Sequence, residues 1–171
     1  MWPVVVLALS AAADTAAVRP VPSVDLGRYV GVWHEIARYP NEFQDQCAGN
    51  VTATYARRED GRLSVANRCR KTDGTVYEAE GVARVVDGSG NARLKVRFAP
   101  AWLGFLPFVW GDYWVIGLDE EYRWAVVGTP DRKYLWILAR DSPMAEEHWD
   151  AAIAKARENG FDPARLQRTP A

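Results

Sequence analysis

Residues 31–38 read Gly31-Val32-Trp33-His34-Glu35-Ile36-Ala37-Arg38 and begin a long series of short segments of alternating polarity. Side chains of a β-strand point alternately to its two faces, so Trp33, Glu35 and Ala37 share one face, which we expect to be the inner one. Gly31 lets the backbone bend or approach a neighbour closely. A tryptophan that opens the first strand of an all-β chain is expected to fill its core.

The rest of the chain repeats this alternation at regular intervals. Turn signals rich in Asp, Gly and Asn separate the segments at residues 59–62, 72–75, 87–91 and 119–121. Strands are expected at residues 51–55, 63–69, 77–85, 94–98, 112–118, 124–128 and 134–140. Short strands joined by hairpin turns indicate an all-β antiparallel meander that closes as an up-and-down barrel or packs as a sandwich.

One helix is expected after the strands. Ser142-Pro143-Met144-Ala145-Glu146 combines an N-cap residue, a proline at the first helical position and an acid in the first turn. Trp149, Ile153 and Ala156 fall on one apolar stripe, and Asn159-Gly160 is a stop signal. A single helix that follows a barrel is expected to pack on its outside.

The composition fits one domain with many aromatic residues. The chain has 171 residues with a formal net charge of −1, which gives no global reason to expect nucleic acid as a partner. Eight Trp, seven Tyr and five Phe are a high density for this length. Aromatic residues at such density line sheet cores, sugar or lipid sites and membrane-facing surfaces.

The N-terminal residues predict export. Residues 1–13 contain an apolar run with small residues at Ala11 and Ala13, which is typical of a secretory signal peptide. Residues 14–23 are expected to be a flexible lead and residues 24–168 the folded domain. Because no Cys lies near the start, anchoring as an outer-membrane lipoprotein is not expected, and a periplasmic or secreted protein is.

Export also affects the two cysteines. Cys47 and Cys69 flank the first hairpin, and an exported pair is expected to form a disulfide. Such a bridge would contribute roughly 2–3 kcal/mol through chain entropy. Two cysteines without other ligands nearby make a poor zinc site, so no metal is expected.

Three blocks of sequence follow one another at characteristic intervals. The first is residues 31–38 with Gly31-x-Trp33, the second is Gly111-Asp112-Tyr113-Trp114-Val115-Ile116 with Asp119, and the third is Tyr134-Leu135-Trp136-Ile137-Leu138-Ala139-Arg140. Together they resemble the three signatures of the lipocalin family. Gly160-Phe161-Asp162-Pro163 is also similar to the bacterial lipocalin group related to apolipoprotein D, and the resemblance covers about residues 24–168.

The resemblance implies an eight-stranded antiparallel up-and-down β-barrel with one C-terminal helix packed outside. The barrel would be shut at one end and open at the other. Trp33 would plug the closed end, with Arg140 across it as a cation–π partner. Cys47 and Cys69 would lie toward the open mouth.

The expected inward positions predict an apolar and aromatic lining. Such a lining suits a long hydrocarbon with one polar end, so we expect binding and transport of a fatty acid or lysophospholipid for envelope lipid storage or maintenance, without a cofactor. The oligomeric state is left open. The residues expected to contact the ligand are Tyr55, Asn67, Val96, Phe98, Tyr113, Trp136 and Leu138.

The segment from Pro100 to Trp110 is unusually apolar for a loop. The family's strand order places it between the fifth and sixth strands at the open mouth. It would either fold over the barrel as a lid or touch a membrane through Trp102, Phe105 and Phe108.

Other readings of the chain stay open at this point. The only histidines, His34 and His148, pair with no nucleophile in a recognisable order, so acyl transfer of the Ser-His-Asp kind lacks its parts. A lipocalin-type enzyme would need a free Cys inside the barrel, and a tetrapyrrole carrier would use the aromatic residues. Glu35 is expected to be either a structural acid bonded to a Tyr or backbone donor, or a polar anchor at the cavity base.

Overall fold

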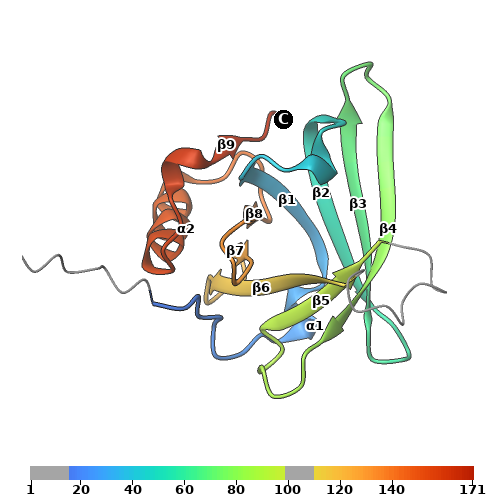
Figure 1. Cartoon of the computed structure of the whole chain (residues 1–171). Coiled ribbons are helices and arrows are strands. Elements are labelled where there is room, and N and C mark those ends of the chain that lie inside the picture. Colours follow the sequence, from blue (N-terminus) through green and yellow to red (C-terminus); the bar gives the residue numbers. More distant parts are fainter. Residues whose placement is uncertain (1–15, 99–109) are drawn as a thin grey trace, which may run out of the picture.

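The computed structural model describes residues 16–98 and 110–171. Their strands form one antiparallel sheet in the order β2-β3-β4-β5-β6-β7-β8-β1-β9, and a further pairing between β1 and β2 closes it into a barrel (Figure 1). The predicted barrel with a C-terminal helix is confirmed. The bounds are β1 Gly31–Arg38, β2 Cys47–Arg57, β3 Leu63–Lys71, β4 Val76–Val85, β5 Arg93–Arg97, β6 Gly111–Leu118, β7 Trp124–Gly128, β8 Leu135–Ala139 and β9 Gln167–Arg168.

β1 closes the barrel by changing its partner along its length. Its first half, from Gly31 to His34, pairs with β2, and its second half, from His34 to Arg38, pairs with β8. The register against β8 shifts between Glu35 and Ala37, which marks a β-bulge. Beyond this bulge β1 no longer pairs with β2.

The bulge changes which side chains of β1 face the barrel interior. Simple alternation places Ala37 inward, and this expectation is wrong, because Ala37 is fully buried in the apolar cluster outside the barrel. The extra residue reverses the alternation, so Arg38 instead stands opposite Trp136, which belongs to the interior cluster. The Arg38 guanidinium then reaches the Glu35 carboxylate at 2.6 Å.

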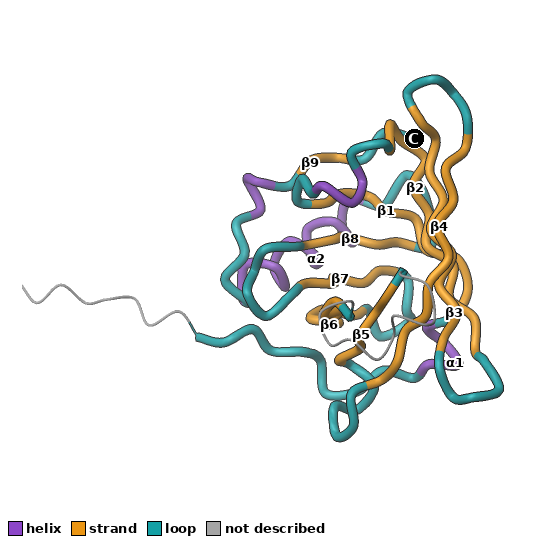
Figure 2. Tube along the Cα trace, turned by 45° about the vertical axis from the view of Figure 1, so that its right-hand side comes forward, coloured by secondary structure: helices purple, strands orange, loops and turns teal. Residues whose placement is uncertain are grey.

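Two apolar clusters lie on the two sides of the barrel wall. β7 shows the alternation clearly, since Ala125 and Val127 pack inside while Trp124 and Val126 pack outside. The outer cluster is covered by α2 (Glu146–Glu158), which contacts β6 and β7 and presents Ala152, Ile153 and Ala156 to them. Figure 2 shows α2 on the outer side of the barrel wall.

The start of α2 differs from its prediction, whereas its end agrees. Ser142 was expected to cap the helix, but the N-cap position is taken by Ala145. Glu146 and Glu147 then occupy the first turn, where negative charge is favourable against the helix dipole. The proline signal therefore marks the approach to the helix and not its cap. Gly160, with a φ of 78°, follows the C-cap Asn159.

The closed end is built around Trp33. The short helix α1 (Leu26–Tyr29) precedes β1, and the Tyr29 carbonyl accepts a hydrogen bond of 2.7 Å from the Trp33 indole. The Arg140 guanidinium lies 3.8 Å from the centre of the Trp33 ring. It also donates hydrogen bonds to the carbonyls of Val32, Arg28, Tyr29 and Val30 at 2.9, 2.8, 3.1 and 3.0 Å.

The lead and the tail both pack on the barrel. Residues 14–23 were expected to be a flexible lead, but the Val21 amide donates to the Val115 carbonyl at 2.8 Å and Val18 is buried. At the other end β9 pairs with β1, and the Asn50 amide of β2 donates to the Pro170 carbonyl at 2.8 Å. The tail therefore joins β1 and β2 where these strands no longer pair, and the folded part extends past residue 168. The predicted signal peptide lies outside the described residues.

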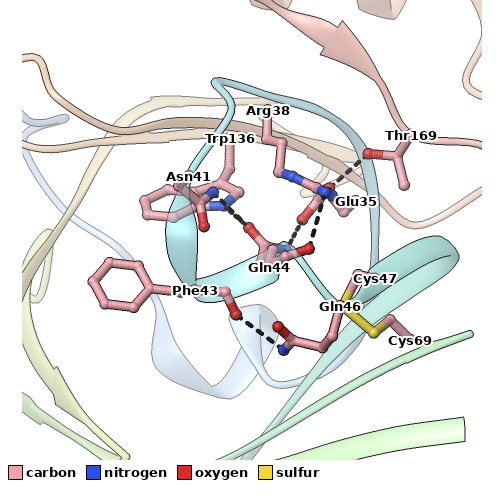
Figure 3. The surroundings of a disulfide bond; sticks show 10 residues. All are labelled: Glu35, Arg38, Asn41, Phe43, Gln44, Gln46, Cys47, Cys69, Trp136 and Thr169. Carbon is pink, nitrogen blue, oxygen red and sulfur yellow. Dashed lines mark hydrogen bonds and ion pairs between the residues drawn. A yellow bond between two sulfur atoms is a disulfide. The ribbon is translucent and has the colours of Figure 1, made fainter. Parts of the chain in front are cut away.

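Cys47 and Cys69 form the expected disulfide, with an S–S distance of 2.03 Å (Figure 3). It joins the start of β2 to β3 beside the 3-10 helix η1 (Glu42–Gln44). Within the described part of the chain, none of the helices has the length and apolar character needed to cross a membrane.

Replacing Arg140 with Lys keeps the positive charge but removes the planar group that serves several carbonyls at once. We expect Arg140→Lys to lower the free energy of unfolding by about 2 kcal/mol, measured by denaturant-induced unfolding. Arg157→Lys, on the exposed side of α2, is the matched control and should leave stability unchanged. Equal stability of the two variants would contradict this role of Arg140.

Removing the disulfide should destabilise the protein without changing its fold. The bridge spans a sequence separation of 22, and a loop of that size contributes about 3 kcal/mol in the chain-entropy model. We expect the double variant Cys47→Ala/Cys69→Ala to lose about that free energy of unfolding while its far-UV circular dichroism stays native. Wild-type protein unfolded with reductant present should show the same loss, and a fully stable double variant would refute the expectation.

Candidate ligand-binding site

The interior of the barrel becomes more exposed from its closed end to its open end. Trp33 at the floor is completely buried, Tyr55 is 6% exposed, and Phe98 just after β5 is 46% exposed. Val96 and Trp136 are half-buried. The interior is therefore closed at the Trp33 end and less tightly covered toward Phe98.

The residues expected to contact a ligand lie at three different depths of the barrel. Tyr55 and Leu138 lie deep in the interior cluster, with Tyr113, Val96 and Trp136 packed against it. Asn67 is half-buried on β3 and pairs with Ala79 of β4. Phe98 lies against Gly81, because a Cβ at that glycine would meet its ring. The small residue of β4 thus makes room for an aromatic ring near the mouth.

Three tyrosines form a connected group above Trp33. The phenol oxygens of Tyr29 and Tyr113 are 2.6 Å apart, and the Tyr55 phenol donates to the Tyr113 oxygen at 3.0 Å. The Tyr29 ring also lies 5.0 Å from the Trp33 ring, centre to centre. We call Tyr29, Tyr55 and Tyr113 the tyrosine group. Tyr29 was not among the expected site residues, because it precedes the first strand and no alternation places it inside.

Burial controls the acidity of the tyrosine group. Desolvation raises the pKa of Tyr55 to about 12, against a smaller lowering by its bond to Tyr113. It also raises the pKa of Tyr29 and of Tyr113 far above the ordinary phenol range. All three phenols therefore stay protonated and uncharged at physiological pH, so the floor of the lumen offers neutral hydroxyl groups.

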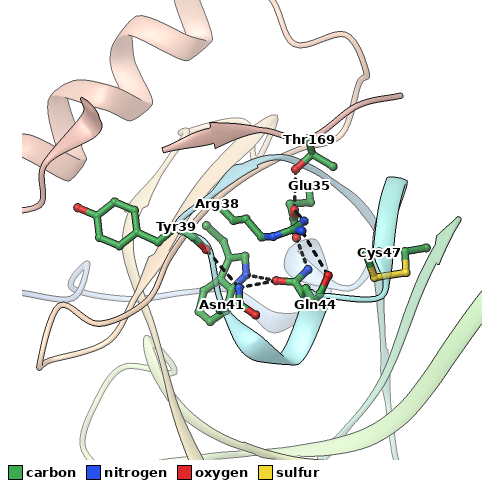
Figure 4. A network of polar contacts seen from close by, with 9 residues as sticks. Glu35, Arg38, Tyr39, Asn41, Gln44, Cys47 and Thr169 are labelled. Atoms are coloured by element: carbon green, nitrogen blue, oxygen red, sulfur yellow. Dashed lines mark hydrogen bonds and ion pairs between the residues drawn. A yellow bond between two sulfur atoms is a disulfide. The ribbon is translucent and has the colours of Figure 1, made fainter. Parts of the chain in front are cut away.

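The mouth has its own polar network, which starts at Gln44 of η1 (Figure 4). The Gln44 side-chain oxygen accepts from the Trp136 indole at 2.9 Å and from the Asn41 amide at 2.8 Å. Its nitrogen donates to the Glu35 carboxylate at 2.6 Å. The loop that follows β1 is thereby tied to a residue of the lumen wall.

Glu35 is the buried centre of that network. Its carboxylate accepts from Arg38 and Thr169 at 2.6 Å each, in addition to Gln44. The expectation of a satisfied structural acid agrees with this geometry, although the donors are side chains of β1, η1 and the tail, not a Tyr or the backbone. With its oxygens occupied, Glu35 offers no anchor at the cavity base. Sequence spacing gave no signal for Gln44 or Thr169, since both lie outside regular strands.

Of the aromatic loop, the described part of the chain includes Trp110 at its end. Trp102, Phe105 and Phe108 lie outside the described residues. Trp110, which precedes β6, is buried beneath the guanidinium groups of Arg84 and Arg97, at 4.4 and 5.0 Å from its ring centre.

The geometry also bears on a cysteine-dependent enzyme activity and on metal binding. The enzyme reading that needed a free cavity Cys is wrong, because Cys47 and Cys69 are the only cysteines and are joined to each other. Among residues 16–98 and 110–171, no group of three or more His, Cys, Asp or Glu side chains could hold a metal ion. His148 lies on α2 outside the barrel, 3.9 Å from Glu147.

Comparison with known proteins places the chain in a family. The family described as "Lipocalin-like domain" matches residues 24–171. The chain is 40% identical over 157 residues to temperature-induced lipocalin-1 of Arabidopsis thaliana, covering 88% of this chain and 81% of that protein. It is 40% identical over 162 residues to the outer membrane lipoprotein Blc of Escherichia coli K12, covering 94% and 87%.

More distant relatives agree with this placement. Apolipoprotein D of Macaca fascicularis is 31% identical over 152 residues, covering 85% of this chain and 76% of that protein. The structure of insecticyanin from the tobacco hornworm Manduca sexta matches with a TM-score of 0.70 at 21% identity, covering 90% of this chain and 84% of that one. At that identity the likeness concerns the fold alone. Because the family match spans the whole barrel, this chain belongs to the lipocalin family, close to bacterial Blc and plant temperature-induced lipocalin and related to apolipoprotein D.

Proposed function

We propose that this lipocalin binds and transports a fatty acid, a lysophospholipid or a similar amphiphile in its barrel. Lipocalins bind small hydrophobic ligands. Blc, the bacterial relative of this chain, is named an outer membrane lipoprotein. The observation that carries the proposal is the apolar and aromatic interior of the barrel, where burial is complete at Trp33 and decreases toward Phe98.

The lining explains how a hydrocarbon would be held. Each buried methylene contributes roughly 0.8 kcal/mol, so a chain of ten methylenes supplies on the order of 8 kcal/mol without a charged partner. Val96 of β5 and Trp136 and Leu138 of β8 supply apolar surface from two separate strands of the wall. The polar atoms of the wall are engaged in part with one another, as in the bond from Trp136 to Gln44.

The proposed setting is the cell envelope or the secreted space. The name of the Blc relatives and the disulfide between Cys47 and Cys69 support it, since such bonds persist in oxidising compartments. Transient membrane contact through Trp102, Phe105 and Phe108 would deliver the ligand to the mouth. The geometry favours binding over catalysis, in keeping with a family of generally non-enzymatic proteins.

A pair of neighbouring substitutions tests binding in the lumen. Ala79 shares the inner face of β4 with Ala83 of the interior cluster, because the β3–β4 register has no shift, whereas its neighbour Glu80 is exposed. We expect Ala79→Trp to fill the lumen and weaken binding of lauric acid and lysophosphatidylcholine at least about tenfold, a loss equivalent to burying two fewer methylenes. The affinities are measured by titration calorimetry.

Glu80→Trp is the matched control, because it adds the same side chain to the opposite face of the same strand. It should bind both compounds with wild-type affinity. Equal affinity of the two variants would contradict binding in the lumen, and wild-type protein that binds neither compound would refute the proposed ligand class.

A further inference from the structure

The tyrosine group has more hydrogen-bond donors than it uses. Each phenol carries one O–H, so Tyr29, Tyr55 and Tyr113 together supply three donors. They make two bonds with each other, and no other hydrogen bond of these phenols occurs with the described residues. One O–H of the group therefore has no acceptor among them, and a buried donor without an acceptor is unfavourable by about 1–3 kcal/mol.

The geometry determines where that O–H is available. Tyr55 donates to Tyr113, and the bond between Tyr29 and Tyr113 can run in either direction. If Tyr29 donates, the Tyr113 oxygen accepts two hydrogen bonds and its own hydrogen is left to point elsewhere. As a whole residue Tyr113 is half-buried, whereas Tyr29 and Tyr55 are buried, so of the three it reaches furthest toward the more exposed part of the interior, although its phenol is buried like theirs. Two accepted bonds also polarise its O–H and make it a better donor.

The electrostatic surroundings select the kind of acceptor. The groups that act on the phenols of the tyrosine group are the other members and, for Tyr29, Arg140. The Arg140 guanidinium is already bonded to the backbone carbonyls of the closed end and to the Trp33 ring. An anionic oxygen at this floor would be desolvated without a cation of its own, which is costly. A neutral ligand oxygen carries no charge that a cation must balance, so a single hydrogen-bond donor is enough to satisfy it.

We propose that Tyr113 is the polar recognition residue of the lumen and that it donates its phenolic hydrogen to a neutral oxygen of the ligand, such as a hydroxyl, ester or ketone oxygen. This inference rests on the proposed function, since it requires a ligand in the barrel. It assigns an orientation, with the neutral oxygen at the floor and the apolar chain directed to the mouth. An ionised carboxylate remains at the mouth instead, where water solvates it.

The test compares 1-dodecanol, dodecane and ionised laurate at pH 8 on the intact protein, by displacement of a fluorescent hydrophobic probe. For each variant the ratio of the dodecane Kd to the dodecanol Kd is the readout, because a loss of folded protein affects both values equally. Tyr113→Phe should lower this ratio about tenfold, as expected for the loss of one hydrogen bond. It should leave the affinity for laurate unchanged.

Two further variants make the result specific to Tyr113. Tyr55→Phe removes one donor to Tyr113 but keeps the recognising O–H, so it should lower the ratio only about two- to threefold. Tyr77→Phe removes an exposed phenol of β4 at the mouth and is the matched control with an unchanged ratio.

The outcomes separate this inference from the proposed function. Wild-type protein that binds none of the three compounds would refute the proposed function itself. Binding of all three, with a ratio that Tyr113→Phe leaves unchanged, would overturn the inference alone. A ratio lowered by Tyr77→Phe would place the ligand oxygen at the mouth, and an equal loss of laurate affinity in Tyr113→Phe would show that the floor takes anions. Either result would also overturn the inference.

Discussion

The stacking of the Arg140 guanidinium on Trp33, at 3.8 Å, is the interaction on which the rest of this structure depends. It brings the end of β8 together with the start of β1, and the same guanidinium holds the backbone around α1 through several carbonyl bonds. Burial lowers the pKa of Arg140, yet the group stays charged because an arginine begins so far above neutrality. One cation thus satisfies backbone carbonyls and an aromatic ring at once. The barrel is therefore closed at this end.

Polar groups inside the barrel wall occur at two levels with different roles. At the mouth, Glu35 and Gln44 are saturated by their partners, so they fix the loop after β1 and the tail against the wall. At the floor, the tyrosine group makes fewer bonds than it has donors. Buried polar groups that are saturated act as structure, and a buried donor that is left over favours an acceptor brought by a ligand. This difference is why we assign recognition to Tyr113 and not to Glu35.

The mouth depends on contacts that are distant in the sequence. β1 leaves β2 at the bulge, and the tail after β9 then bonds to both strands, at Ile36 and at Asn50. The disulfide between Cys47 and Cys69 fastens β2 to β3 close to this tail, since Cys47 and residues 167–170 line one surface pocket. The end of the barrel opposite Trp33 is therefore held by a tail and a covalent bond, because the regular ladder between β1 and β2 stops short of it.

The sequence by itself determined the fold class, the family, the strands and the outer helix, and it predicted the disulfide that the structure contains. These depend on period-two alternation, on turn residues and on spaced motifs, which are local properties of the chain. Only the tertiary structure decided that Ala37 faces outward and Arg38 inward, because a bulge reverses alternation and leaves no mark in the residue pattern. It also decided the donors of Glu35 and the joining of Tyr29 to Tyr113, since each unites segments far apart in the chain. Hydrogen-bond partners are chosen by distance in space, and spacing along a strand carries no information about them.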